Sequence, residues 1–340
     1  MRRNAKRRSP RRAKPIRTSC RHRHIVPGAT WHITQKTNDD LFWLVPSPLV
    51  NAILLYLLAL KAKRYGVLVH AYFFASNHIH LVATDPEGKL PAFMRELLGE
   101  SGKAIKLARR TTCDIWRDER YAATRHLDID ALERSIPYLE LNSMEAELTE
   151  PEEWPGLTSA RHRFGETITV ARPEIYFSEK RPETVDLVRS PLSCASPELW
   201  GESAEGSEAD RSSPEEIRKA AERDAASEAR MREMVEKRSA EIRASLAERK
   251  QRLAGPERVM RTPCTKRTTH PIRNLNPRFS TRNRELLAHA IAEYRQFEID
   301  HEAAKRRYLA GQQRTHFPVG TYGYRVMLGV RVARRRRRAA

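Results

Sequence analysis

The chain has 340 residues and a formal net charge of +20, and charged residues make up 31% of it. This length suffices for two domains of ordinary size, or for one domain with long tails. So large a positive charge favours a polyanionic partner, most commonly nucleic acid, and argues against a membrane, because the basic runs at both ends lack large apolar residues at helical spacing.

The cellular compartment is indicated by three further features. The four cysteines form no CxxC pair, as expected in a reducing compartment. The basic N-terminal run is not followed by the apolar core of a signal peptide. The most apolar stretch, residues 49–60, is shorter than the roughly 20 residues that span a bilayer. We therefore expect a cytoplasmic, nucleoid-associated protein.

Residues 1–27 are predicted to be a disordered basic arm. No acidic residue occurs between Met1 and Arg23. A block of like charges repels itself and gains order only when it meets an anion. We expect ordered structure to begin near Gly28.

The next part, residues 28–165, alternates between strand and helix patterns. β-branched and aromatic residues predict strands, and apolar residues repeated at three and four positions predict helices. This order predicts a compact α+β domain with helices on one face of an antiparallel sheet. The predicted elements are a strand at 30–34, a helix from 46–48 to 64, a hairpin of strands 67–74 and 79–84, and helices at 90–108 and 130–148.

The helix predicted at 90–108 has an apolar stripe and an opposite face that is basic. Such a face is either solvated or binds phosphates, and we expect it to bind the phosphates of DNA. The residues predicted to bind DNA are Arg95, Lys103, Lys106, Arg109 and Arg110, together with Arg120 further along the chain.

Three segments are predicted after residue 165. Residues 166–213 are read as an irregular linker, because their second half is rich in Ser, Pro and Glu. Ser213-Pro214-Glu215-Glu216 is typical of a helix start and opens a charged helix in 214–255. Residues 256–340 form a basic C-terminal extension with a helix at 282–309.

The sequence Asn77-His78-Ile79-His80 carries the strongest chemical signal. Alternate side chains of a strand share a face, so His78 and His80 would project together while Ile79 points into the core. Two converging imidazoles are a natural pair of metal ligands. The plainer interpretation is that they are ordinary histidines of a sheet.

A second signal is Tyr138 followed by Asn142. Residues four apart share one face of a helix, so both would face a metal held by the two histidines. The amide oxygen of Asn142 would be a third ligand and Tyr138 a nucleophile. A phenol of pKa about 10 needs such activation before it can attack.

Four segments together resemble the REP-associated tyrosine transposases, which are relatives of the IS200-like single-tyrosine HUH transposases. They match the family's HUH strand, its next helix, its Trp/Arg-aromatic segment and its nucleophile helix with the loop that follows, and they cover about residues 28–163. The four segments are 70–82, 91–95, 115–121 and 136–155.

The resemblance implies a ferredoxin-like fold and a divalent cofactor, Mg²⁺ or Mn²⁺. It implies that Tyr138 attacks single-stranded DNA beside a hairpin, forms a 5′-phosphotyrosyl intermediate and releases a 3′-hydroxyl, as in DNA transposition and recombination. The sequence departs from the family at Pro137, where a helix begins or bends, and at residues 143–147, where acids replace basic residues.

Two other functions stay open at this point. A non-cleaving DNA-binding relative, such as a repressor or architectural protein, would keep the fold and lose the chemistry. A general RNA-binding basic protein would need no metal and form no covalent adduct. The sequence also leaves open whether the protein is a monomer or a homodimer.

Overall fold

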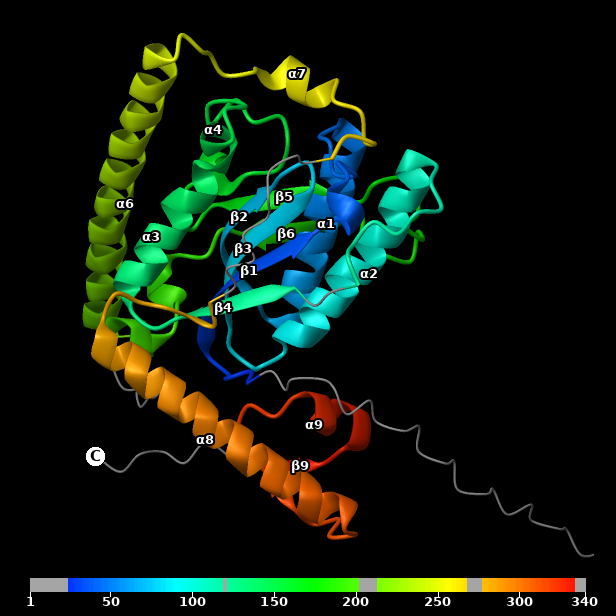
Figure 1. The fold of residues 1–340 in the computed structure, drawn as a ribbon, viewed down its shortest axis with the longest axis vertical. Coiled ribbons are helices and arrows are strands. Elements are labelled where there is room, and N and C mark those ends of the chain that lie inside the picture. The colour runs from blue at the N-terminus through cyan, green and yellow to red at the C-terminus, as the bar shows by residue number, and fades with distance from the viewer. Residues whose placement is uncertain (1–23, 119–120, 202–212, 268–276, 334–340) are drawn as a thin grey trace, which may run out of the picture.

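The computed structural model describes residues 24–118, 121–201, 213–267 and 277–333 (Figure 1). Two predictions therefore fall wholly or largely outside the described residues: the disordered basic arm 1–27 and the DNA contact by Arg120. The arm ends earlier than predicted, because Ile25 and Val26 are buried in the described structure. Within the described ranges no helix is both long enough and apolar enough to cross a membrane.

The centre of the molecule is a five-stranded sheet in the order β2-β3-β1-β4-β7. The pairs β1–β3, β2–β3 and β1–β4 are antiparallel, and only the short β4–β7 pair is parallel. The sheet is thus mainly antiparallel, as the sequence predicted. Its strands are β1 (Ala29–Lys36), β2 (Leu68–Phe74), β3 (His78–Asp85), β4 (Ala122–His126) and β7 (Phe279–Ser280).

One face of this sheet is covered by α1 (Pro48–Tyr65) and α2 (Leu90–Arg109). Ser47 caps α1 by accepting a hydrogen bond from the Val50 N–H, and Gly66 ends the helix in the left-handed conformation at φ 64°. The largely apolar α1 and the apolar stripe of α2 pack on alternate strand residues such as Trp31, Ile33 and Leu81.

The opposite face is also covered, which corrects the prediction of helices on one face only. Leu132 and Ile136 of α3 (Ile129–Glu140) pack on Phe73 and Val82 of the sheet. The physical reason is that β2 and β3 also carry apolar side chains on this second face, such as Phe73 and Val82, and these must be buried as well. In Figure 1 α3 lies across the face of the sheet opposite α1 and α2.

The segment 166–213, predicted to be an irregular linker, contains a two-stranded sheet. Strands β5 (Thr167–Ala171) and β6 (Thr184–Val188) pair in antiparallel fashion. Val185 and Leu187 alternate with exposed residues and are buried in the core beside α1. This alternation is the signal for a strand, and the Ser-, Pro- and Glu-rich composition obscured it.

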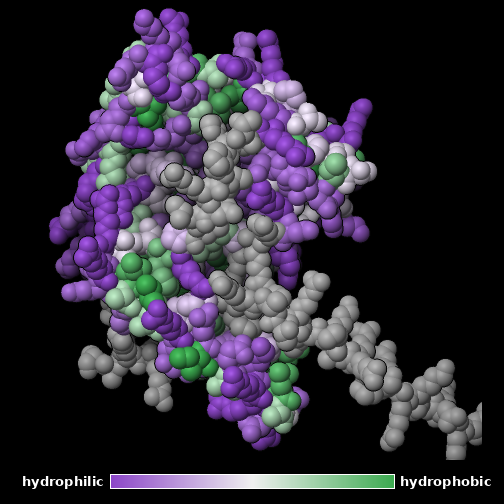
Figure 2. Space-filling view, in the orientation of Figure 1, coloured by the Kyte–Doolittle hydropathy of each residue, from purple (hydrophilic) through white to green (hydrophobic). Residues whose placement is uncertain are grey.

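In Figure 1, α6 (Pro214–Glu248) lies along the outer side of α3, α7 (Pro256–Met260) lies above the sheet, and α8 (Arg284–Leu309), α9 (Gly323–Leu328) and β9 (Arg331–Val332) lie below it. The 35-residue helix α6 occupies the region where a charged helix was predicted, and Figure 2 shows its outer side as mostly hydrophilic. The other short elements are α4 (Asn142–Glu145), β8 (His316–Phe317) and the 3-10 helices Asn38–Asp40, Ser159–Arg161, Leu192–Cys194 and Pro197–Trp200.

The C-terminal part joins the sheet as well as extending from it. Strand β7 adds to the edge of β4 through hydrogen bonds from Arg125 N–H to Arg278 O (2.8 Å) and from Leu127 N–H to Ser280 O (3.1 Å). Helix α8 (Arg284–Leu309) follows directly, where the sequence predicted a helix at 282–309. The predicted extension therefore contributes a strand to the central sheet.

Candidate catalytic site

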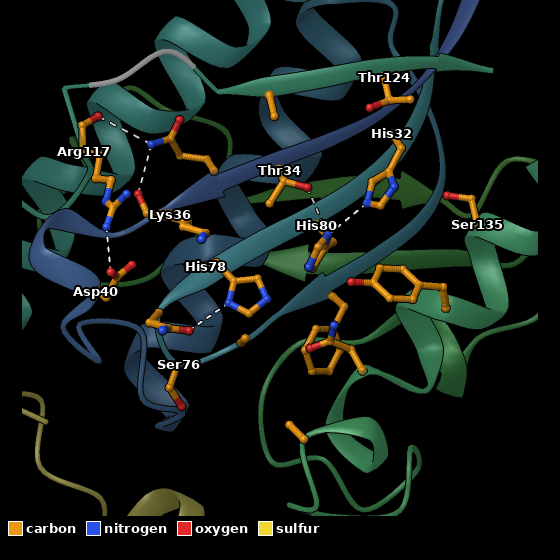
Figure 3. A pocket seen from close by; sticks show the side chains of 18 of the residues that line it. His32, Thr34, Lys36, Asp40, Ser76, His78, His80, Arg117, Thr124 and Ser135 are labelled. Carbon is orange, nitrogen blue, oxygen red and sulfur yellow. Dashed lines mark hydrogen bonds and ion pairs between the residues drawn. The ribbon is translucent and has the colours of Figure 1, made fainter. Parts of the chain in front are cut away.

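His78 and His80 project from the same face of β3, and their ring centroids are 4.8 Å apart (Figure 3). Ile79 between them points into the core and is 1% exposed. The strand begins at once after a tight turn, in which the Ala75 N–H donates to the His78 carbonyl at 2.9 Å. Turn and strand alternation together bring the two imidazoles side by side, as the sequence predicted.

In both His78 and His80, the ring nitrogen Nδ1 is engaged in hydrogen bonds. Nδ1 of His78 lies 2.8 Å from Oδ1 of Asn77, which can only accept, so Nδ1 donates. Nδ1 of His80 lies 2.9 Å from Nε2 of His32 and 3.1 Å from Oγ1 of Thr34. When Nδ1 carries the proton in both rings, the lone pairs are on the two Nε2 atoms, as in metal-binding histidines.

The protonation state of His78, His80 and His32 also suits the binding of a divalent ion. Burial, and then the nearby Lys36, lower the pKa of His78 to about 4, and burial lowers the pKa of His32 to about 4. Burial and the charges of its neighbours take the pKa of His80 well below its ordinary value. All three rings are therefore neutral at pH 7, which is the form that binds metals.

Two histidines alone make an incomplete metal site. In the described ranges no group of three or more His, Cys, Asp or Glu side chains is arranged to hold an ion. A third protein ligand would have to be of another type. The side chain of Asn142 lines the same cavity and carries an amide oxygen, which suits Mg²⁺ or Mn²⁺.

Tyr138 stands opposite the histidines on α3. Its ring centroid is 5.8 Å from that of His80 and 6.1 Å from that of His32, and the residue is 51% exposed. Asp128 caps the start of α3, its Oδ1 accepting from the Ala131 N–H at 2.7 Å. An open cavity of about 770 Å³ lies between helix and sheet and is lined by Tyr138, Asn142, His78 and His80, among others.

The helix that carries Tyr138 is shorter than predicted. Instead of one helix over 130–148, α3 ends at Glu140 and α4 begins at Asn142, with Leu141 (φ −83°, ψ 0°) between them. Pro137 lies inside α3 and lacks the N–H that would bond one turn back, which weakens the helix here. Tyr138 and Asn142 nevertheless reach the same cavity.

The phenol of Tyr138 is protonated at neutral pH. Burial, and then the carboxylate of Glu145, raise its pKa above the ordinary value. A protonated phenol is a weak nucleophile, so attack requires a base or a cation that stabilises the oxyanion.

The end of α3 is held by a buried arginine. Arg189 donates to Oε1 of Glu140 at 2.6 Å and also donates to three backbone carbonyls, those of His70, Ser159 and His162. Its guanidinium lies 3.9 Å from the centroid of the Phe164 ring. Glu140 comes two residues after Tyr138, so this contact ties the helix that carries Tyr138 to the core.

We expect Arg189→Ala to lower the free energy of unfolding by about 3–5 kcal/mol, because it leaves the buried Glu140 without its cation. Urea denaturation would measure the change. Arg243→Ala is the control, since the exposed Arg243–Glu150 pair contributes little to stability. Equal effects of the two substitutions would contradict the anchoring role of Arg189.

The basic residues predicted to bind DNA do not lie at this cavity. Arg95, Lys103, Lys106, Arg109 and Arg110 are on or just after α2, on the other face of the sheet, and none lines the cavity. Arg109 donates to the carbonyls of Trp43 and Val45, and Lys106 pairs with Asp114 at 2.5 Å. Their binding to DNA stays a prediction, and such contacts would be remote from Tyr138.

Four other cations line the cavity and were missed in the sequence: Lys36, Arg117, Arg134 and Lys266. Lys36 could have been predicted from the sequence, because it lies two residues after Thr34 and four after His32 on one strand and therefore shares their face. Figure 3 shows Lys36 on the histidine side of the cavity, near Arg117, which pairs with Asp40 at 2.6 Å.

Comparison with known proteins gives partial likenesses only. No family model matches the chain, and no curated protein matches it. A REP-associated tyrosine transposase solved with a REP hairpin is 17% identical, covers 42% of this chain and 84% of its own, and has a TM-score of 0.36. A Deinococcus radiodurans protein assigned provisionally as a transposase is 19% identical, covers 33% of this chain and 84% of its own, and has a TM-score of 0.24.

Proposed function

We propose that the protein is a single-tyrosine HUH transposase that cleaves and rejoins single-stranded DNA at hairpin-associated sites. Tyr138 would be the nucleophile, and His78, His80 and Asn142 would hold Mg²⁺ or Mn²⁺. The observation that carries the proposal is the half-exposed phenol of Tyr138 facing two neutral imidazoles across one open cavity.

The chemistry assigned to the chain is a transesterification. The bond from Tyr138 Oη to phosphorus forms as the bond from phosphorus to the 3′-oxygen breaks. The phenolic proton passes to solvent, and the released 3′-oxygen takes up a proton. The phosphotyrosyl bond conserves the energy of the phosphodiester, so rejoining needs no nucleotide cofactor. A bound divalent ion would supply Lewis-acid activation of the scissile phosphate.

The architecture and the charge support this proposal. The first six main elements follow the order β-α-β-β-α-β, and the strand order β2-β3-β1-β4 is the one expected of a ferredoxin-like sheet. The net charge of +20 favours a polyanionic substrate. Lys36 and Lys266 line the cavity and would face the phosphates of a bound strand.

The second candidate is a DNA-binding relative of the same fold that does not cut. It is favoured by Pro137 within the nucleophile helix and by Glu145, whose charge raises the pKa of Tyr138. Such a protein would bind hairpin DNA with normal salt dependence and would form no covalent product.

The deciding experiment is incubation of the full chain with single-stranded hairpin DNA and Mn²⁺, followed by denaturing electrophoresis and peptide mapping of any adduct. We expect a covalent DNA–peptide product that contains Tyr138. Chelator and a matched RNA hairpin are the controls. DNA binding without an adduct across several hairpins would favour the non-cutting candidate, and equal binding of RNA without metal would favour an RNA-binding protein.

A further inference from the structure

Helix α6 runs parallel to α3 and α4 along their outer side (Figure 1). Three side-chain contacts share nearly the same separation in sequence. Ser227 Oγ donates to Glu133 at 2.6 Å, Arg238 Nε donates to Glu145 at 2.7 Å, and Arg243 Nε donates to Glu150 at 3.0 Å, with separations of 94, 93 and 93 residues. These contacts show that α6 and the segment from Glu133 to Glu150 run side by side in the same direction.

Four arginines of α6 and its C-terminal end contact carboxylates of the earlier segment, and three of the four pairs are two-pronged. Such pairs fix direction as well as distance, because two parallel N–H groups meet the two oxygens of one carboxylate. They are Arg230–Glu133 (2.9 and 2.6 Å), Arg238–Glu145 (2.7 and 3.1 Å) and Arg243–Glu150 (3.0 and 2.8 Å), and Arg249–Glu147 adds a single contact of 2.8 Å.

An apolar cluster lies beneath the charged pairs. Leu141 and Met144 pack against Ile242 and Leu246 of α6, and Leu141 is 2% exposed. Leu141 is the residue at which α3 ends and α4 begins. Helix α6 therefore contacts the break itself as well as the helices on each side.

The contacts with α6 lie on both sides of the part of α3 and α4 that Pro137 and Leu141 weaken. Pro137 cannot donate to the carbonyl of Glu133, and the helix is interrupted at Leu141, so Tyr138 lies between two local defects. Glu133 is held by α6 before the first defect, and Glu145 is held after the second. A helix weakened in this way would otherwise bend around Tyr138.

Stability alone does not explain the arrangement. Arg238 and Arg243 are each about half exposed, and exposed ion pairs add little to the free energy of unfolding. The reaction rate is far more sensitive than stability to the position of Tyr138, because reactivity falls steeply when a reacting atom is displaced by about 1 Å. Directional pairs can therefore matter for the rate while contributing little to stability.

We propose that α6 supports α3 and α4 from outside and limits their bending around Tyr138; we call this support the splint. Arg230, Arg238 and Arg243 are then positioning residues that hold Tyr138 opposite the histidines. The splint deepens the proposed function and rests on it. It also accounts for the acids that follow Asn142. Arginines of α6 bind the carboxylates of Glu145 and Glu150, and Arg249 just after α6 binds that of Glu147, which offsets their repulsion of a DNA strand.

The test is a charge swap in the full chain. Arg238→Glu is expected to slow adduct formation at saturating DNA by about tenfold or more, since small displacements of a nucleophile cost up to about a hundredfold. Glu145→Arg is expected to slow it less, because it also removes the negative charge that raises the pKa of Tyr138. The double variant restores a pair of opposite charges and is expected to recover most of the rate. Arg218→Glu is the matched control, because the described residues give Arg218 an ion pair within α6, with Glu222 at 3.6 Å, and none with α3 or α4.

Two further measurements distinguish a displaced Tyr138 from a general loss of stability. The urea midpoint should stay close to wild type in Arg238→Glu, while the rate falls even at DNA concentrations that saturate the variant. Amide hydrogen exchange of the DNA-free protein should be faster over residues 138–148 in each single variant and slow again in the swap. A fall in the urea midpoint that accounts for the whole loss of rate would overturn the proposal.

Failure of the splint and failure of the proposed function are distinguishable. If wild type forms adduct and Arg238→Glu changes neither its rate nor amide exchange over 138–148, the splint is refuted and the nuclease stands. If wild type forms no adduct with any substrate, the proposed nuclease fails, and exchange still decides on the splint: faster exchange supports it, and unchanged exchange refutes it.

Discussion

Tyr138→Phe is expected to eliminate the covalent protein–DNA adduct completely while leaving the fold and the affinity for DNA intact. The substitution removes one oxygen, and the phenyl ring keeps its contacts with His32 and His80. Because the covalent bond has no other atom from which to form, the loss should lie entirely in chemistry. Denaturing electrophoresis measures the adduct, and a fluorescence-anisotropy titration measures DNA binding.

Tyr65→Phe is the matched control for this substitution. Tyr65 is the last residue of α1, on the other face of the sheet, and its pKa is raised by burial and by Glu96. It should retain full adduct formation. The assignment of Tyr138 would fail if its phenylalanine variant still formed adduct, or if mapping of the wild-type adduct found DNA on a different tyrosine.

The second large effect is expected from His78→Ala combined with His80→Ala. Loss of the ion removes several kcal/mol of transition-state stabilisation, which corresponds to a decrease in cleavage rate of about a thousandfold or more. DNA affinity should change far less, because lysine and arginine contacts to phosphates supply most of it. Calorimetric titration with Mn²⁺ should show that the double variant no longer binds the ion.

His289→Ala serves as control, since His289 is an exposed residue of α8. It should bind Mn²⁺ and cleave DNA as wild type does. Asn142→Ala should give an intermediate loss that excess Mn²⁺ partly reverses, if the amide is a ligand. Full cleavage by the double histidine variant, or by wild type in chelator, would remove the metal from the mechanism.

Much of the sheet and the helices on one of its faces could be predicted from local pattern. The apolar stripe of α2 and the Pro48 and Gly66 boundaries of α1 depend on neighbours within a few turns, and the structure places both helices close to the predicted bounds. The coverage of the second face was missed. It depends on α3 and α6 packing against Phe73 and Val82, and no local pattern specifies a partner so distant in sequence.

In the candidate site, too, some features follow from local sequence pattern and others depend on residues far apart in the sequence. The shared face of His78 and His80 follows from strand alternation and was predicted. The bond from His80 to His32 was not, because it depends on the register of β1 against β3, in which Thr34 lies opposite His80 and His32 lies one diagonal step away. The supporting role of α6 was hidden for a similar reason, since its partners are about 93 residues earlier.

The pairing of β4 with β7 has a consequence for solubility. Without β7, the backbone N–H groups of Arg125 and Leu127 would lie on an open strand edge, and such edges recruit strands from other molecules. Residues 279–280 come late in the chain, so the edge can be capped only after most of the polypeptide has been made. A fragment that stops before residue 277 would retain both histidines and Tyr138, yet it would tend to aggregate through β4.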